Sequence, residues 1–248
     1  MAKQFTSVWT REPRQPRPSG LSRDQIVAAA LEILGTEGLE ALSMRKLGAK
    51  LGAGATSLYW HVANKSELLE LALDEIWGVV DDADLDGAAT LRELLTTFAY
   101  NLRSALLAHP WVASLIGQIP SIGPKAFQLS ERLRHAFLDA GFQGMDVYLA
   151  SGTVTNFVLG HTLPVIAMKN AYGDELVVGG IEQTLDKIAA AYPEMLADYR
   201  AAIPTDPQVI SAMGFDFGLL CVLDGLETRL RAPSGAHDRE QRTEPRAR

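Results

Sequence analysis

Residues 43–66 read SMRKLGAKLGAGATSLYWHVANKS, and this stretch decides the fold of the N-terminal part of the chain. Ser43 can accept hydrogen bonds from the first turn of a short helix that follows it. The Gly52–Gly54 run predicts a tight connection, because glycine adopts turn conformations that other residues avoid. A second short helix is expected over residues 55–62. The stretch therefore predicts two short helices joined by a tight turn.

The second of these helices has an unusual distribution of large side chains. Leu58 and Val62 lie four residues apart and can face a core, which leaves Tyr59, Trp60 and His61 pointing largely outward. In a helix-turn-helix the second helix enters the major groove of DNA, so such a surface suits a nucleic-acid partner. The alternative is that the two large rings pack against another domain.

Helices are also expected on both sides of this pair. Ser22 can cap a helix that ends at Gly38, and Asn64 can cap one that runs toward Val80; each has a reciprocal capping residue three positions on. The acidic, glycine-ended run of residues 81–87 then leads into a larger body.

The rest of the chain repeats the helical pattern and shows no strand-like alternation, so the fold class is all-α. A three-helix head is expected over 21–66 and a larger helical body over 67–231. The further helices are expected over residues 90–108, 111–118, 125–140, 145–168 and about 207–230, with a shorter one between 180 and 192.

Composition excludes several classes of protein. The 248 residues are 47% hydrophobic and 21% charged, which rules out a wholly disordered chain. The single cysteine, Cys221, can form neither an internal disulfide nor a cysteine zinc site. The apolar stretch 154–168 is too short and too polar to span a bilayer. No catalytic, cofactor or metal motif is found, so we expect a cytoplasmic non-enzyme without cofactor or metal and without a membrane partner.

Charge is distributed unevenly along the chain. Residues 1–66 carry nine basic and five acidic residues, a net charge of +4, whereas the remainder carries −11. A basic module attached to an acidic body is typical of a protein that meets a polyanion through one end. The basic, proline-rich residues 1–20 are expected to be a disordered arm, either inert or bound to DNA, and residues 232–248 a flexible tail.

The first block of motifs closely resembles the DNA-binding domain of the TetR family of bacterial repressors, nearest to the tetracycline repressors. Fainter similarity covers most of the remaining chain. The resemblance implies an all-helical homodimer with a DNA-binding head and a C-terminal ligand domain. Its motifs are Arg45-Lys46-Leu47, Leu51-Gly52, the run from Ser57 to Val62, Asn64-Lys65, Ala105-Leu106-Leu107-Ala108-His109, Phe157-Val158-Leu159-Gly160 and Gly225-Leu226-Glu227.

The resemblance also implies which residues contact DNA. Residues at the start of the second short helix are expected to read the DNA bases. Residues at the end of that helix and at the start of the next one are expected to contact the DNA backbone or thymine. The family's glutamine and proline at the start of that helix are replaced here, which changes the expected operator. The predicted DNA-binding residues are Arg45, Ala55, Thr56, Ser57, Tyr59, Trp60, His61 and Lys65.

On the ligand side, the chain departs from the tetracycline repressors. Ile116 and Asp81 stand at histidine positions of the family, and Pro164 stands at a glutamate position. Without oxygen or imidazole ligands from Ile116 and Pro164, a tetracycline–magnesium chelate is not expected. The effector is expected to be a mainly apolar small molecule bound without metal.

The predicted ligand-binding residues are Trp77, Phe98, Asn101, Leu102, Ile116, Gln118, Leu133 and Asn156. For Asn156 a hydrogen bond between helices at a dimer interface is an equal alternative. The sequence thus predicts a ligand-responsive repressor that binds a palindromic DNA operator as a homodimer. The alternative is a ligand-independent architectural DNA-binding protein, which would not need so large an acidic body.

Overall fold

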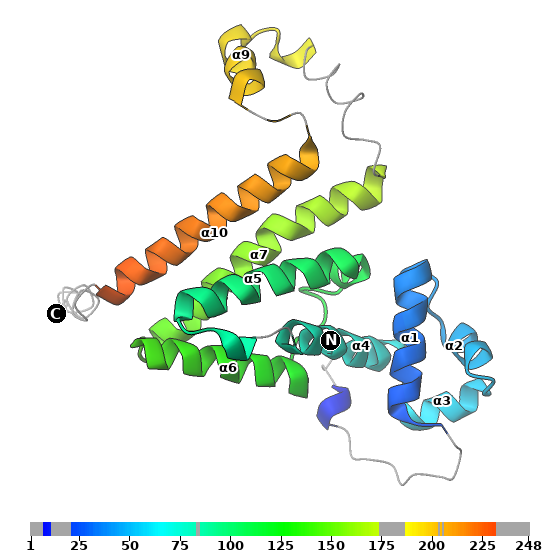
Figure 1. Cartoon of the computed structure of the whole chain (residues 1–248). Coiled ribbons are helices and arrows are strands. Elements are labelled where there is room, and N and C mark those ends of the chain that lie inside the picture. The colour runs from blue at the N-terminus through cyan, green and yellow to red at the C-terminus, as the bar shows by residue number, and fades with distance from the viewer. Residues whose placement is uncertain are drawn as a thin grey trace, which may run out of the picture.

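The computed structural model describes residues 7–10, 21–82, 85–173, 187–202, 204 and 206–231. These residues form helices and no strand, which confirms the predicted all-α class (Figure 1). The α-helices are α1 (Arg23–Glu37), α2 (Met44–Lys50), α3 (Ala55–His61), α4 (Lys65–Asp82), α5 (Leu91–Ala108), α6 (Pro124–Ala140), α7 (Met145–Tyr172), α9 (Pro193–Ala202) and α10 (Pro207–Arg231). Short 3-10 helices are η1 (Val8–Thr10), η2 (Leu85–Gly87) and η3 (Pro110–Ser114).

Local capping sets where the helices begin, as the sequence predicts. The Ser22 hydroxyl accepts a hydrogen bond from the Gln25 backbone N–H at 3.1 Å, and the Gln25 side chain accepts from the Ser22 N–H at 2.8 Å. Thr90 and Glu93 form the same reciprocal pair at the start of α5. These bonds satisfy backbone donors that the first turn of a helix leaves unpaired.

The head consists of α1, α2 and α3 around a small apolar core. Ile26 and Ile33 of α1 are buried together with Leu47 of α2 and Leu58 of α3. α1 also packs against α4, which runs from the head into the body. The head is therefore joined to the rest of the molecule mainly through α4 (Figure 1).

The body packs α4 to α7 and α10 around large buried rings. Phe98 of α5, Phe137 of α6 and Phe215 of α10 are almost completely buried. In Figure 1, α5, α7 and α10 lie side by side, and each pair is in contact. α9 stands apart from this layer and buries none of its residues.

Several elements differ from the sequence-based expectation. The helix predicted over 111–118 is the 3-10 helix η3 followed by turns, since Gly117 adopts a left-handed φ of 82° that interrupts an α-helix. α7 extends beyond its predicted end at residue 168, to Tyr172. Pro164 lies inside this helix, which stays packed on the core because Thr162 and Ile166 on either side of the proline are buried. α9 was not predicted, and most of the helix predicted over 180–192 lies outside the described residues.

The N-terminal arm also differs from its prediction over residues 7–10. These residues form η1 and pack on α4, with Ser7 and Val8 buried. The expectation of a disordered arm is therefore wrong at residues 7–10. The rest of residues 1–20 and the predicted tail 232–248 lie outside the described part of the chain.

Candidate DNA-binding and ligand sites

α3 has the geometry of a recognition helix. Leu58 and Val62 are fully buried, and this orientation turns Tyr59 and Trp60 outward with 43% and 42% of their surface exposed. Thr56 is exposed near the start of the helix. Gly52, with a left-handed φ of 60°, makes the turn between α2 and α3. The outward orientation of the two large rings predicted from the sequence is thus confirmed.

The remaining predicted DNA-binding residues surround these rings. Ser57 and His61 are half-buried on the same helix, and the side chain of Ala55 is not among those described. The Lys65 ammonium donates a hydrogen bond to the Leu39 carbonyl at 3.0 Å, which ties the start of α4 to the turn after α1. Lys65 therefore has a structural role in addition to its predicted phosphate contact.

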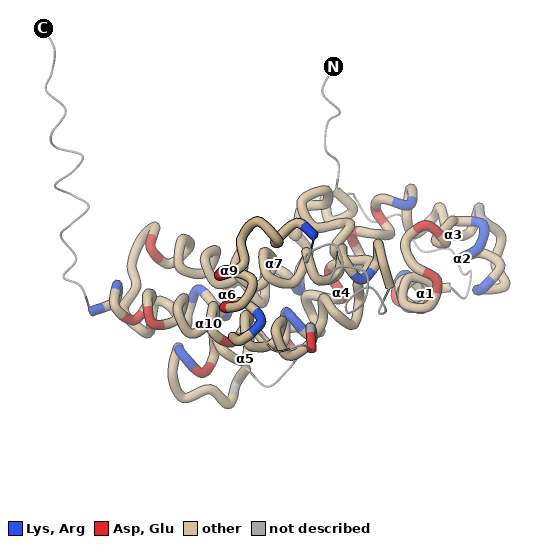
Figure 2. The backbone as a smooth tube through the Cα atoms, turned by 90° about the horizontal axis from the view of Figure 1, so that it is seen from above, with Lys and Arg blue, Asp and Glu red and all other residues tan. Residues whose placement is uncertain are grey.

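Figure 2 shows basic positions on α2 in blue and acidic positions on α1 in red, and the basic residues of α2 differ in whether they form ion pairs. Lys46 pairs with Glu37, and Lys50 pairs with Glu32 at 2.6 Å, so α1 supplies counter-charges for both lysines. Arg45 is exposed and makes no ion pair with any residue that the structure describes. Arg45 is thus the α2 cation best placed to meet an external anion.

One face of α4 carries a row of buried carboxylates that the sequence analysis missed. Glu67, Glu70, Asp74 and Asp81 are three, four and seven residues apart, a spacing that places them on one side of a helix. A buried carboxylate is costly unless hydrogen bonds satisfy it. The spacing of four acids at helical periodicity was the available signal, and it was obscured by the apolar residues between them.

The four carboxylates in this row bind three different parts of the chain. Glu67 accepts from the Ala63 N–H at 2.7 Å, and Glu70 accepts from the Ser7 hydroxyl at 2.7 Å and the Val8 N–H at 3.2 Å. Further along α4, the remaining two carboxylates both bind α6. Asp74 accepts from the N–H groups of Lys125 and Ala126 at 3.2 and 3.0 Å, and Asp81 meets Gln128 at 3.0 Å and Arg132 at 3.1 Å.

The predicted ligand residues occupy different depths of the body. Trp77 is half-buried, and its indole N–H is buried without an acceptor among the described residues. Asn156 is exposed on α7 within one chain. Phe98, Leu102 and Leu133 are buried in the core, Asn101 and Ile116 are half-buried, and Gln118 is exposed.

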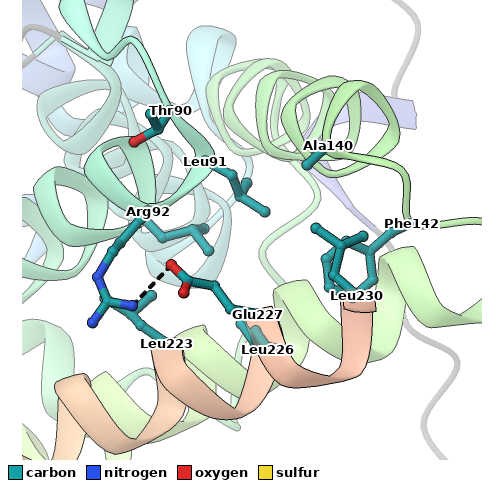
Figure 3. Close-up of a pocket in the computed structure, with 10 residues that line it drawn as sticks. Thr90, Leu91, Arg92, Ala140, Phe142, Leu223, Leu226, Glu227 and Leu230 are labelled. Carbon is teal, nitrogen blue, oxygen red and sulfur yellow. Dashed lines mark hydrogen bonds and ion pairs between the residues drawn. The ribbon is translucent and has the colours of Figure 1, made fainter. Parts of the chain in front are cut away.

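A cavity of about 250 Å³ lies at another corner of the body, between α5, the end of α6 and the end of α10. Figure 3 shows Leu91, Phe142 and Leu226 at its walls and the Arg92–Glu227 ion pair, 2.9 Å long, at one side. None of the predicted ligand residues lines this cavity. Its charged groups satisfy one another, because Arg92 also binds Asp224.

A cluster of rings joins α5, α7 and α10. Phe215 is buried with the Tyr100 and His161 rings at 5.3 and 5.4 Å, and the Arg103 guanidinium lies 4.8 Å from its ring centre. His161 Nδ1 is buried without a partner among the described residues. Burial lowers the pKa of His161, and the positive charge of Arg103 lowers it further. Both effects favour the neutral form of His161.

The outer faces of α7 and α10 carry large apolar side chains. Phe217 on α10 is 71% exposed, and Met213 and Leu220 beside it are also exposed, as are Tyr148 and Leu149 on α7. Residues Gln208–Arg231 are long and apolar enough, by length and composition alone, to cross a membrane. Only 22% of the 18-residue apolar stretch within this helix is buried. The same composition suits a bundle helix that packs one face against the core of its own chain and the other face against a partner.

Three positions at which the resembled repressors carry histidine or glutamate hold Ile116, Asp81 and Pro164 in this chain. Ile116 has only hydrocarbon to offer, and Pro164 is an exposed ring inside α7. Asp81 is already engaged by Arg132 and Gln128. Among the described residues no group of three or more His, Cys, Asp or Glu side chains converges as a metal site would require.

Comparison with known proteins follows the same division into head and body. Residues 26–72 match the family described as bacterial regulatory proteins, tetR family, and residues 84–230 match the tetracyclin repressor-like C-terminal domain. The HTH-type transcriptional repressor DrrR1 of Streptomyces coeruleorubidus is 32% identical over 238 residues, which cover 92% of this chain and 86% of that protein.

Two further proteins are similar. An HTH-type transcriptional regulator of Saccharopolyspora erythraea is 43% identical over 155 residues, which cover 62% of this chain and 65% of that relative, slightly less than two thirds of its length. The crystal structure of ActR from Streptomyces coelicolor in complex with actinorhodin has a TM-score of 0.70 and 25% identity, covering 86% of this chain and 99% of that one. The matches to both domains show that this chain belongs to the TetR family of transcriptional repressors.

Proposed function

We propose that this chain represses transcription as a cytoplasmic homodimer that binds a palindromic operator and is released by a small molecule. The observation that carries the DNA-binding part is α3, where buried Leu58 and Val62 force Tyr59 and Trp60 outward. Two such helices related by a two-fold axis fit successive major grooves about 34–36 Å apart. Arg45, which makes no ion pair with the described residues, adds a cation that can bind a phosphate.

The outer faces of α7 and α10 support the homodimer. Exposure of the apolar side chains of Phe217, Leu220 and Tyr148 to water is unfavourable, and pairing with a second copy removes that exposure. Four helices, two from each copy, would then form the interface. Asn156 and Gly160 of α7 lie on exposed parts of the same helix, where a partner helix can approach.

The effector in this proposal is a mainly apolar molecule held without metal. Ile116 and Pro164 favour hydrocarbon over a hydrated cation, and Asp81 is committed to α6. The indole N–H of Trp77, which has no acceptor among the described residues, suits an acceptor oxygen on such a molecule, since a buried donor without an acceptor is unfavourable. ActR in complex with actinorhodin supports this reading, because a protein of the same family and fold binds an organic ligand.

α4 is the proposed route from ligand to DNA. It contacts α1 in the head and both α5 and α6 in the body, so a shift of the body moves the head. Typical coupling between two such sites is about 1–3 kcal/mol. A ligand-independent architectural protein has no need of this connection, and the C-terminal domain match also disfavours that alternative.

The test is release of DNA by a panel of compounds with and without EDTA. The wild-type protein first selects a duplex from random DNA, and dissociation is then followed by fluorescence anisotropy. We expect apolar aromatic compounds to release the DNA equally with and without EDTA. Release by tetracycline with magnesium at micromolar concentration, abolished by EDTA or by Ile116→Ala, would show that the metal-free effector is wrong.

A further inference from the structure

The segment Ser7–Thr10 packs at a defined position on α4. Val8 is 2% exposed and lies in the main core, and Trp9 packs partly against it. The Ser7 hydroxyl accepts from the Trp9 N–H at 3.2 Å and donates to Glu70 at 2.7 Å, so the segment both caps its own turn and binds the helix. In Figure 1 this short helix lies beside α4 between the head and α6.

Glu70 holds this segment through hydrogen bonds. Its carboxylate is buried, with 6% of the residue exposed, and both hydrogen bonds that the structure shows for it come from Ser7 and Val8. Removal of the segment would leave this carboxylate without those two donors. A carboxylate is tolerated beneath the segment only where hydrogen bonds satisfy it, so the two donors of Ser7 and Val8 favour this placement of the segment on Glu70.

The position of Glu70 along α4 places its contact with the segment between the head and the body. Glu67 binds the turn that ends the head, Asp74 binds the first turn of α6, and Glu70 lies between them on the same face. Seven residues of helix span about 10 Å, which leaves room for one short element between head and body. The segment fills that place.

We propose that Ser7–Thr10 is a spacer in the joint between the DNA-binding head and the body, and that Glu70 is the residue that positions it. The spacer limits how the head can tilt on α4, and so holds the two recognition helices at the separation that the operator requires. This role rests on the proposed DNA-binding function. Without the spacer, the head samples more orientations and binds DNA less tightly, because fewer of them fit the operator.

The experiment compares full-length protein with Glu70→Ala and with a chain lacking residues 1–10. A chain lacking residues 1–6 keeps the spacer and is the matched control for truncation. Glu75→Ala is the control for loss of an acid on α4, since Glu75 pairs with Lys125 and not with the segment. The readouts are affinity for a duplex selected from random DNA by the wild-type protein, and hydrogen exchange of residues 65–74.

We expect Glu70→Ala and loss of residues 1–10 each to weaken DNA binding by about fivefold or more, at the lower end of typical coupling between sites. Both should speed exchange in α4, and combining them should add nothing beyond the truncation, because they remove one contact. Glu70→Gln, which keeps an acceptor oxygen, should recover part of the affinity. Both control variants should behave as wild type.

Wild-type affinity in both Glu70→Ala and the chain lacking residues 1–10 overturns the proposal, even if exchange is faster, since the segment would then be only a structural element. Additive effects of the two changes also overturn it. If the wild-type protein selects no duplex, the proposed function fails, and the exchange of α4 still decides whether the segment holds the joint.

Discussion

Replacing Asp74 by alanine should destabilise the protein, because this carboxylate caps α6 from outside the helix. Its two oxygens accept from the Ala126 and Lys125 N–H groups at 3.0 and 3.2 Å. The residues at the start of α6, Gly123 and Pro124, offer no capping side chain of their own. A Cβ at Gly123 would collide with the carboxylate, which shows how closely the two segments approach.

The magnitude follows from the burial of the two donors. Ala126 is buried, so its N–H would lose its acceptor without gaining water, at a cost of about 1–3 kcal/mol. Lys125 is half-buried and water can reach it, so its N–H adds less, and loss of a negative charge at a helix N-terminus adds about 0.5 kcal/mol. The total for Asp74→Ala is about 2–4 kcal/mol. Asp74→Asn keeps one acceptor oxygen and should cost about half as much.

The assay is urea unfolding at one fixed protein concentration, because the stability of the proposed dimer would depend on concentration. With a denaturant slope of about 3 kcal/mol per M, the Asp74→Ala midpoint should fall by about 1 M. Asp139→Ala, an exposed acid at the other end of α6, is the control and should change stability by less than about 0.5 kcal/mol. Equal midpoints for Asp74→Ala and Asp139→Ala would refute the reasoning, as would unchanged hydrogen exchange in the first turn of α6.

Three further outcomes are expected. Arg45→Ala should weaken binding to all duplexes and reduce the slope of log affinity against log salt by about one, whereas Lys169→Ala in the body should leave that slope unchanged. Phe217→Glu should convert the proposed dimer to a monomer in sedimentation velocity, and a dimer that persists would contradict the proposed α7–α10 interface. His161 has a pKa lowered from 6.5, so its contribution to stability is complete above about pH 6.5 and is lost as pH falls toward its folded-state pKa. His161→Gln should therefore reduce the fall in urea midpoint between about pH 7.5 and pH 5.5, and an unchanged fall would show that this ring is not responsible.

The sequence by itself determined the features that depend on near neighbours along the chain. The caps at Ser22 and Thr90 involve partners three residues away, so the pattern of residue types is sufficient to predict them. The outward orientation of Tyr59 and Trp60 follows from the spacing of Leu58 and the helical period. The division into a basic head and an acidic body is likewise a property of the residue order.

Only the tertiary structure decided which distant segments meet. Ser7 binds a carboxylate 63 residues away, and Arg92 binds Glu227 across 135 residues, separations at which no local rule selects a partner. The same reasoning explains why the arm was misjudged: Val8 and Trp9 form a short apolar pair in a mostly polar stretch, and the burial of Val8 depends on packing against α4 and the core. Long-range packing chooses among many chemically equivalent contacts, and that choice depends on how all the helices fit together at once.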